Sequence, residues 1–372
     1  DEGFDAPQHP INDALFTRYF TVRYQLYKLT NYMEHTPELE ETDVYLQSMD
    51  FAHAWMLGLI PTEEIYRELM GRVNSPTRIK DITSALDERN HSLFHSLTQK
   101  VVNRILEIEL QRGDSETQVT RLAEELHRVY GAETLIRILQ AFGKDTFIRD
   151  SYNWRNTKRG VLSSLLHACY PSPDDDSDTL KSLASQADIS HIRLVEAAMF
   201  APQWLELTEK ATGWKGLESA AYYFHAHTSE CFDDKKKAII ARYTPIAIED
   251  LQEGAFDIDW FKEAYKTIGK ERFEVVYNAA KYISLSNTHT RARKFADAVN
   301  GKTKAADAKK EIIAKRNKDL LMSYGLIPLG RKADKELLER YQFLQKFLKE
   351  SKEFGAQRQE SEKKAVTIAL QN

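Results

Sequence analysis

Four residues in one short stretch are of the types that bind transition metals. His225, His227, Glu230 and Cys231 lie close together, and imidazole, carboxylate and thiolate groups are the usual protein ligands of such ions. A His-x-His spacing lets both rings reach one ion when the backbone is extended. On a helix, residues two apart point about 200° away from each other, so His227 would share a face with Glu230 while His225 would not.

The residues before these histidines favour the helical arrangement. The sequence predicts a helix over residues 217–224, which ends in Tyr222, Tyr223 and Phe224. The alternative to a metal-dependent enzyme using His225, His227 and Glu230 is therefore a packing role, in which one ring lies among the aromatics and the other is solvated. We expect no catalytic residue, no bound metal and no cofactor here.

A second candidate site is the stretch 147–160, which interrupts the helical pattern with arginines and aromatics. Guanidinium and indole groups together suit phosphates or stacked bases. The alternative is that the aromatics anchor the loop while the cations stay in water. The candidate contacts to an anion or a nucleic acid in this loop are Arg149, Trp154, Arg155, Lys158 and Arg159.

A third candidate is the most basic part of the chain, residues 291–318. It holds ten Lys or Arg residues against Asp297, Asp307 and Glu311. Such a segment can steer an anionic partner, or it can be the solvated face of a helix. Its candidate contacts are Arg291, Arg293 and Lys294.

Short catalytic motifs are absent from the sequence. We find no phosphate-binding Gly-x-x-x-x-Gly-Lys-Ser/Thr loop, no Gly-x-Gly-x-x-Gly after a strand, no His-Glu-x-x-His and no paired Cys-x-x-Cys. Sites assembled from distant residues leave no such trace. The absence therefore makes an enzyme the less favoured reading without excluding one.

The composition is that of an ordinary globular protein, and we expect the protein to lie in the cytoplasm. Of its 372 residues 42% are hydrophobic and 29% charged, and the net charge is −4, so any binding of a polyanion must be local. The two cysteines, Cys169 and Cys231, provide no disulfide framework, as is typical of a reducing compartment. No segment contains the run of about 18 consecutive apolar residues that a membrane-spanning helix needs.

Helical periodicity with short breaks predicts an all-α fold. We expect a multi-helix array of stacked antiparallel helical pairs with little or no β-sheet, of which a HEAT-like repeat is one form. The prolines and aspartates of residues 170–178 suggest a boundary between an N-terminal helical region, 1–173, and a C-terminal one, 179–372. The latter contains the basic segment 291–318 and ends in long helices.

The last helices carry an apolar seam, and the chain ends suggest a longer protein. Leu337, Tyr341, Leu344 and Leu348 step by four, three and four along a polar helix. The chain begins with Asp1, and residues 365–370 read as helix without a terminating signal. We therefore expect a fragment of a larger protein.

Three stretches together resemble a bacterial protein family. They are residues 194–204 with Gly213-Trp214 and Ala226-His227, residues 321–330, and Arg340-Tyr341 with residues 350–358. They are similar to large proteins carrying the domain of unknown function numbered four-one-three-two, and the likeness extends from about Leu106 to the end. Some members are labelled molybdate-metabolism regulators and some carry a WGR domain. The resemblance thus implies a part of a longer intracellular protein, with an ADP-ribosylation or nucleic-acid context by analogy.

The sequence suggests two hypotheses about the function, one as a scaffold and one as a regulatory module. The preferred hypothesis is a non-catalytic helical scaffold that binds a protein partner or the remainder of the same polypeptide. The alternative is a nucleic-acid-binding or ADP-ribosylation-associated regulatory module that uses the two arginine-rich segments, whose binding would weaken steeply with salt. Neither involves a membrane.

Overall fold

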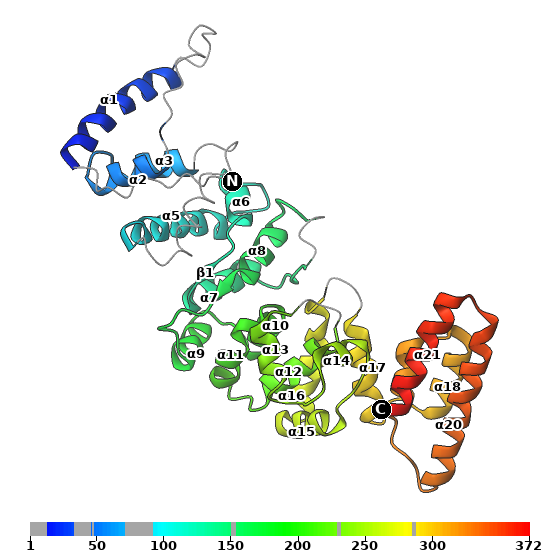
Figure 1. Cartoon of the computed structure of the whole chain (residues 1–372). Helices are drawn as coiled ribbons and strands as arrows, with labels where there is room; N and C mark the ends of the chain where they lie inside the picture. Colours follow the sequence, from blue (N-terminus) through cyan, green and yellow to red (C-terminus); the bar gives the residue numbers. More distant parts are fainter. Residues whose placement is uncertain are drawn as a thin grey trace. The chain divides into compact units, whose positions relative to one another are not determined.

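The structure is a computed structural model that describes residues 13–32, 46, 48–70, 92–149, 154–228, 232–284 and 288–372. Within these residues it is an array of α-helices with two short strands, so the predicted all-α class is confirmed (Figure 1). Contacts divide the chain into two compact units, residues 1–129 with 154–168 and residues 130–153 with 169–372. These limits differ from the division at 173–179, which stays a prediction.

The described residues of unit 1 are mostly helical. Its described helices are α1 (Asp13–Tyr32), α2 (Ser48–Met56), α3 (Thr62–Met70), α5 (Ser92–Leu110), α6 (Thr120–Glu124) and α8 (Lys158–His167).

The aromatic side chains of α1 form one core of unit 1. Phe16, Phe20 and Tyr27 are buried, and Phe20 and Tyr27 both contact the edge or face of Phe51 on α2. The hydroxyl of Tyr27 donates a hydrogen bond to Glu68 on α3. Buried aromatics that satisfy their polar ends in this way attach α1 firmly to α2 and α3.

A buried ion pair organises the other end of unit 1. Arg112 Nη1 lies 2.5 Å from Glu109 Oε1, and both side chains are almost fully buried. Thr117 and Thr120 donate further hydrogen bonds to Glu109, and Arg112 Nη2 donates to the carbonyl of Asn156 at 3.0 Å. A buried pair is favourable only with such additional hydrogen bonds, so this network fixes the loop before α8.

Strands β1 (Val129–Tyr130) and β2 (Cys169–Tyr170) pair in parallel. The proline- and aspartate-rich stretch after β2 lies within unit 2, where its carboxylates bind backbone amides. Asp175 accepts from the amides of Ala132 and Ser172 at 2.9 and 2.7 Å. Asp176 is the N-cap of the next helix and accepts from Thr179. The sequence features that suggested a linker are thus turn and capping residues.

The described part of unit 2 is a series of α-helices and short 3-10 helices. Its elements are α7 (Ala132–Phe142), α9 (Ser177–Gln186), α10 (His191–Phe200), η2 (Pro202–Trp204), α11 (Leu205–Thr212), α12 (Leu217–Ala226), α13 (Asp234–Ile240), α14 (Ile248–Glu253), α15 (Ile258–Ile268), α16 (Lys270–Ala279), η3 (Ala280–Tyr282), α17 (His289–Val299), α18 (Ala305–Lys315), α19 (Lys318–Tyr324), α20 (Ala333–Glu350), η4 (Ser351–Glu353) and α21 (Ala356–Gln371).

Helix α12 lies at the centre of unit 2 and packs against α11, α15, α16 and α17. Its residues 220–226 are all buried, as a helix surrounded by neighbours must be. Tyr223 contacts the rings of Phe256 and Phe261, and its hydroxyl donates to the carbonyl of Ala292 at 2.7 Å. One tyrosine therefore ties α12 to α15 and α17.

The last helices form a group around α19, which packs against α17, α18 and α21, while α20 and α21 lie side by side (Figure 1). Arg316, just after α18, joins three of them. Its guanidinium pairs with buried Glu362 on α21, donates to Ser351 Oγ at 3.0 Å and lies 3.9 Å from the Phe347 ring centroid. Burial raises the pKa of Glu362, but hydrogen bonds from Arg316, Ser351 and Arg358 outweigh burial and lower that pKa to about 2.

None of the helices in the described residues has the length and apolar character that crossing a lipid bilayer requires.

Candidate functional site

The two histidines that were considered as metal ligands, His225 and His227, belong to the core of unit 2. His227 lies with Nδ1 2.8 Å from the carbonyl oxygen of Tyr223 and Nε2 3.2 Å from that of Ala255. Its ring contacts Phe256 and Phe295. Burial lowers the pKa of His227 to about 4, although the two carbonyls favour the protonated ring. His227 is therefore a neutral ring packed inside the fold, and its single N–H donates to one of the two carbonyls.

His225 is also buried. The packing alternative, in contrast, expected one of the two rings to be solvated. Burial lowers its pKa well below the usual value, and the charges of Lys236 and Arg149 act in the same direction. Glu230 and Cys231 lie outside the described residues. Among the residues that the structure does describe, no three His, Cys, Asp or Glu side chains are grouped so as to hold a metal ion.

The arginine-rich loop 147–160 is divided between the two units. Arg149 belongs to unit 2, where Nε donates to the carbonyl of Tyr282 at 2.7 Å and Nη2 to that of Phe200 at 2.5 Å. Trp154, Arg155, Lys158 and Arg159 belong to unit 1. The guanidinium of Arg149 therefore joins segments of unit 2 through their carbonyls.

The unit 1 part of this loop presents an aromatic and a cation to solvent. The Trp154 ring is 42% exposed, and the Arg159 guanidinium lies 5.4 Å from its centroid. The Trp154 carbonyl accepts from Thr157, the N-cap of α8. A Cβ on Gly160 would lie 2.1 Å from that carbonyl oxygen, so only glycine fits at this position. The turn is thus well defined, and its role as an anion contact stays a prediction.

In the basic segment 291–318 the structure brings most cations to partners within unit 2. Arg293 donates to the carbonyls of Tyr277 and Asn278, both at 3.0 Å. Lys294 lies 3.9 Å from Asp319. Three more cations form ion pairs: Lys302 with Glu274 and Asp297, Lys315 with Glu311, and Arg316 with Glu362. Lys304 and Lys310 are exposed.

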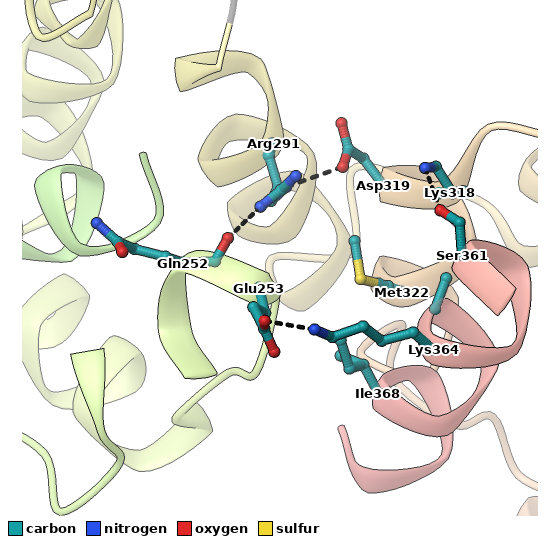
Figure 2. Close-up of a pocket in the computed structure, with 10 residues that line it drawn as sticks. Gln252, Glu253, Arg291, Lys318, Asp319, Met322, Ser361, Lys364 and Ile368 are labelled. Carbon is teal, nitrogen blue, oxygen red and sulfur yellow. Dashed lines mark hydrogen bonds and ion pairs between the residues drawn. The ribbon is translucent and has the colours of Figure 1, made fainter. Parts of the chain in front are cut away.

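Arg291, one of the predicted contacts, lines a pocket in unit 2 (Figure 2). This cavity of about 260 Å³ lies between α14, α17, α19 and α21. Arg291 Nη1 donates to the carbonyl of Gln252 at 2.5 Å, and Nε donates to Asp319 at 2.8 Å. The pocket residues are Gln252, Glu253, Arg291, Lys318, Asp319, Met322, Ser361, Lys364, Ala365 and Ile368.

The other cations of the pocket also have partners. Lys364 on α21 forms an ion pair with Glu253 on α14, and Lys318 Nζ donates to Ser361 Oγ at 2.6 Å (Figure 2). The Lys318 side chain is exposed, and its hydrogen bond to Ser361 connects α19 to α21. Two ion pairs, Arg291 with Asp319 and Lys364 with Glu253, and these hydrogen bonds connect the four helices around the pocket.

Close packing sets the back of this pocket. Gly254 ends α14 with φ +121°, and a Cβ there would lie 2.5 Å from Met322 Sδ. Asn372 donates to the Gly254 carbonyl at 3.1 Å, and its own oxygen accepts from the Phe256 amide at 3.0 Å. A left-handed glycine thus lets α14 approach α19 and the end of α21.

Sequence reasoning missed Glu253, Asp319, Ser361 and Lys364. They come from three helices separated by many residues, and each lies in an ordinary polar helix face. The only sequence signal was the high density of cations around Arg291, which did not identify their partners.

Comparison with known proteins identifies a family. A family model described as "Family of unknown function (DUF5724)" matches residues 3–372. No curated protein and no solved structure matches the chain. The resemblance to the family numbered four-one-three-two was wrong, because a different family model covers almost the whole chain and nothing supports the first. The expectations drawn from molybdate regulation and WGR domains fall with it. The chain belongs to the Family of unknown function (DUF5724).

Proposed function

We propose that this chain is a helical interaction module whose α18–α21 group binds a protein partner through α20. The observation that carries the proposal is the exposure of large apolar side chains on this helix. Leu337, Leu338 and Tyr341 are 58, 55 and 51% exposed. Single exposed apolar residues are common, but three within a turn and a half of helix form a patch of the kind that marks an interface.

The seam on α20 extends this patch from the core into solvent. Leu344 is buried at 3% exposure and Leu348 is partly buried, whereas Tyr341, about one turn before Leu344, and Leu337, about two turns before it, are exposed. The seam that packs α20 into its helix group thus continues beyond the residues that cover it. A partner helix can extend the same side-to-side packing along it.

A groove on another side of α20 makes a second part of the helix accessible. It has a volume of about 300 Å³ and includes Phe343 and Phe347 of α20 and Ile313 of α18. The ammonium of Lys309 lies 5.1 Å from the Phe343 ring centroid. Phe343 and Phe347 are buried, whereas Ile313 is 58% exposed, so Ile313 is the apolar side chain of the groove that a partner can cover.

The basic segment gives less support to the nucleic-acid alternative. Affinity for nucleic acid arises from cations that can replace counterions at phosphates. Arg291, Arg293 and Arg316 instead contact carboxylates and carbonyls inside unit 2. We therefore favour a protein partner.

Site-specific photo-cross-linking tests the proposal. A benzophenone amino acid placed at Tyr341 in the full chain, in its native cells, should form one dominant adduct with another protein. The same group at Lys363, an exposed position on α21, is the matched control and should not form that adduct. Equal labelling from both positions, or none from Tyr341, would contradict the proposal.

A further inference from the structure

Helix α1 carries an exposed apolar stripe on the side away from its packed aromatics. Leu15, Tyr19 and Val22 are 65, 42 and 59% exposed, and Leu26, at 45%, continues the series. Their spacing is four, three and four residues. At about 100° per residue these positions cover only about 60° of the helix circumference. The stripe is therefore a narrow seam with the spacing of coiled-coil a and d positions.

Another side of α1 packs against the rest of unit 1. Phe16, Phe20 and Tyr27 are buried, and Lys28 lies 3.7 Å from Glu64 on α3. The one acidic residue of α1, Asp13, lies 3.5 Å from His53 on α2. The polar contacts of α1 to the rest of unit 1 thus involve residues outside the stripe.

Two of the four residues that flank the stripe are basic; the other two are Phe16, which is buried, and Gln25, which is exposed. Arg18 flanks one edge and is exposed. Arg23 flanks the other, where Nη1 donates to the Tyr19 hydroxyl at 2.7 Å and the guanidinium lies 5.2 Å from the Tyr19 ring centroid. These positions correspond to e and g of a coiled coil, whose charges select the partner. Both edges of the seam therefore favour a negatively charged neighbour.

We propose that this face of α1 binds an amphipathic helix of another protein, with apolar residues at its a and d positions and Glu or Asp at e and g. A second copy of this chain is disfavoured, because Arg18 and Arg23 would meet like charges across the seam. A lipid surface is disfavoured, because interfacial helices bury a much wider apolar face than this seam. The surface lies in unit 1, so the inference is independent of the role proposed for α20.

Two synthetic peptides of about four heptads test this binding. Both have Leu at a and d; one has Glu and the other Lys at e and g. Fluorescence anisotropy with the full chain should give a Kd for the acidic peptide at least about tenfold lower than for the basic one. The double substitution Arg18→Glu and Arg23→Glu should reverse this order. Val22→Ser should weaken binding of the acidic peptide about tenfold, whereas Arg121→Glu, on exposed α6 residue Arg121, should change neither Kd.

Several results would overturn the inference. Binding of neither peptide would do so, as would a preference that survives the charge reversal while the thermal unfolding of the double variant matches that of the wild type. Binding to phosphatidylserine vesicles that is lost in Val22→Ser would assign the seam to a membrane surface. A concentration-dependent dimer that Val22→Ser dissociates in sedimentation would assign it to a second copy of the chain.

Discussion

Two basic regions of this protein use their cations in opposite ways. In the basic segment 291–318, Arg291, Arg293 and Arg316 contact carboxylates, carbonyls and aromatic rings of neighbouring helices. On α1, Arg18 and Arg23 lie beside exposed apolar side chains. The longer and more basic region is therefore the more structural one. Whether cations are available to a partner depends on how many acceptors the fold places around them.

Removal of Arg316 should have the largest effect on stability. Arg316→Ala leaves Glu362, whose side chain is 2% exposed, without its main counter-charge, and breaking such a buried pair costs about 3–5 kcal/mol. Lys315→Ala, which removes an exposed pair with Glu311, should cost under about 0.5 kcal/mol. Urea unfolding of both variants measures the difference. Equal free energies of unfolding would remove Arg316 from its structural role.

Acid should destabilise unit 2 through its buried histidines. The pKa of His227 is about 4 in the folded state and about 6.5 in the unfolded chain. The unfolded state then binds more protons between these values, so stability is full above about pH 6.5 and falls by roughly 3 kcal/mol as the pH drops towards 4. His227→Gln should flatten this profile and His191→Gln, at an exposed position, should not. An unchanged slope in His227→Gln would contradict the core role.

Arg291 should contribute less than Arg316, because it is 23% exposed and its partner Asp319 is 28% exposed. Arg291→Ala should lower the free energy of unfolding by about 1–2 kcal/mol, since it removes charge-assisted hydrogen bonds that water partly replaces. Lys310→Ala, in the same basic segment but exposed, should change it by under about 0.5 kcal/mol. Thermal unfolding of the two variants provides the test, and a greater loss in Lys310→Ala would reverse our assignment.

The seam on α1 should be nearly neutral for stability. Arg18→Ala and Val22→Ala remove exposed side chains, and surface substitutions usually change the free energy of unfolding by less than about 0.5 kcal/mol. Phe20→Ala, on the packed side of the same helix, removes a side chain that is 1% exposed and should cost about 3–5 kcal/mol. Chemical denaturation of the three variants tests both sides. A large loss in Val22→Ala would mean that the seam is part of the fold.

The class of the fold could be predicted from the sequence, whereas the partners of its charges could not. Periodicity identifies α12 and α20 as helices because it depends on neighbouring residues. It also identified the seam at Leu337 and Tyr341. It could not show that His225 and His227 are both buried, since that depends on α15, α16 and α17 packing around α12.

The pocket around Arg291 shows the same limit. Glu253, Asp319 and Lys364 meet only because α14, α19 and α21 approach one another, and one sequence does not report such contacts between distant segments. The hydrogen-bond acceptors of Arg149 could not be predicted from the sequence either. Its sequence neighbours suggested a phosphate contact, but its acceptors are the carbonyls of Phe200 and Tyr282, which lie far away in the chain.

One measurement compares the two kinds of partner directly. The tagged full chain is captured from its native cells, and the co-purified protein and nucleic acid are quantified for two variants that reverse or add surface charge. Leu337→Glu with Tyr341→Glu should remove a stoichiometric protein partner, and Lys304→Glu with Lys310→Glu should leave that partner in place. Loss of bound nucleic acid in the lysine variant, with no protein lost from the α20 variant, would contradict the account.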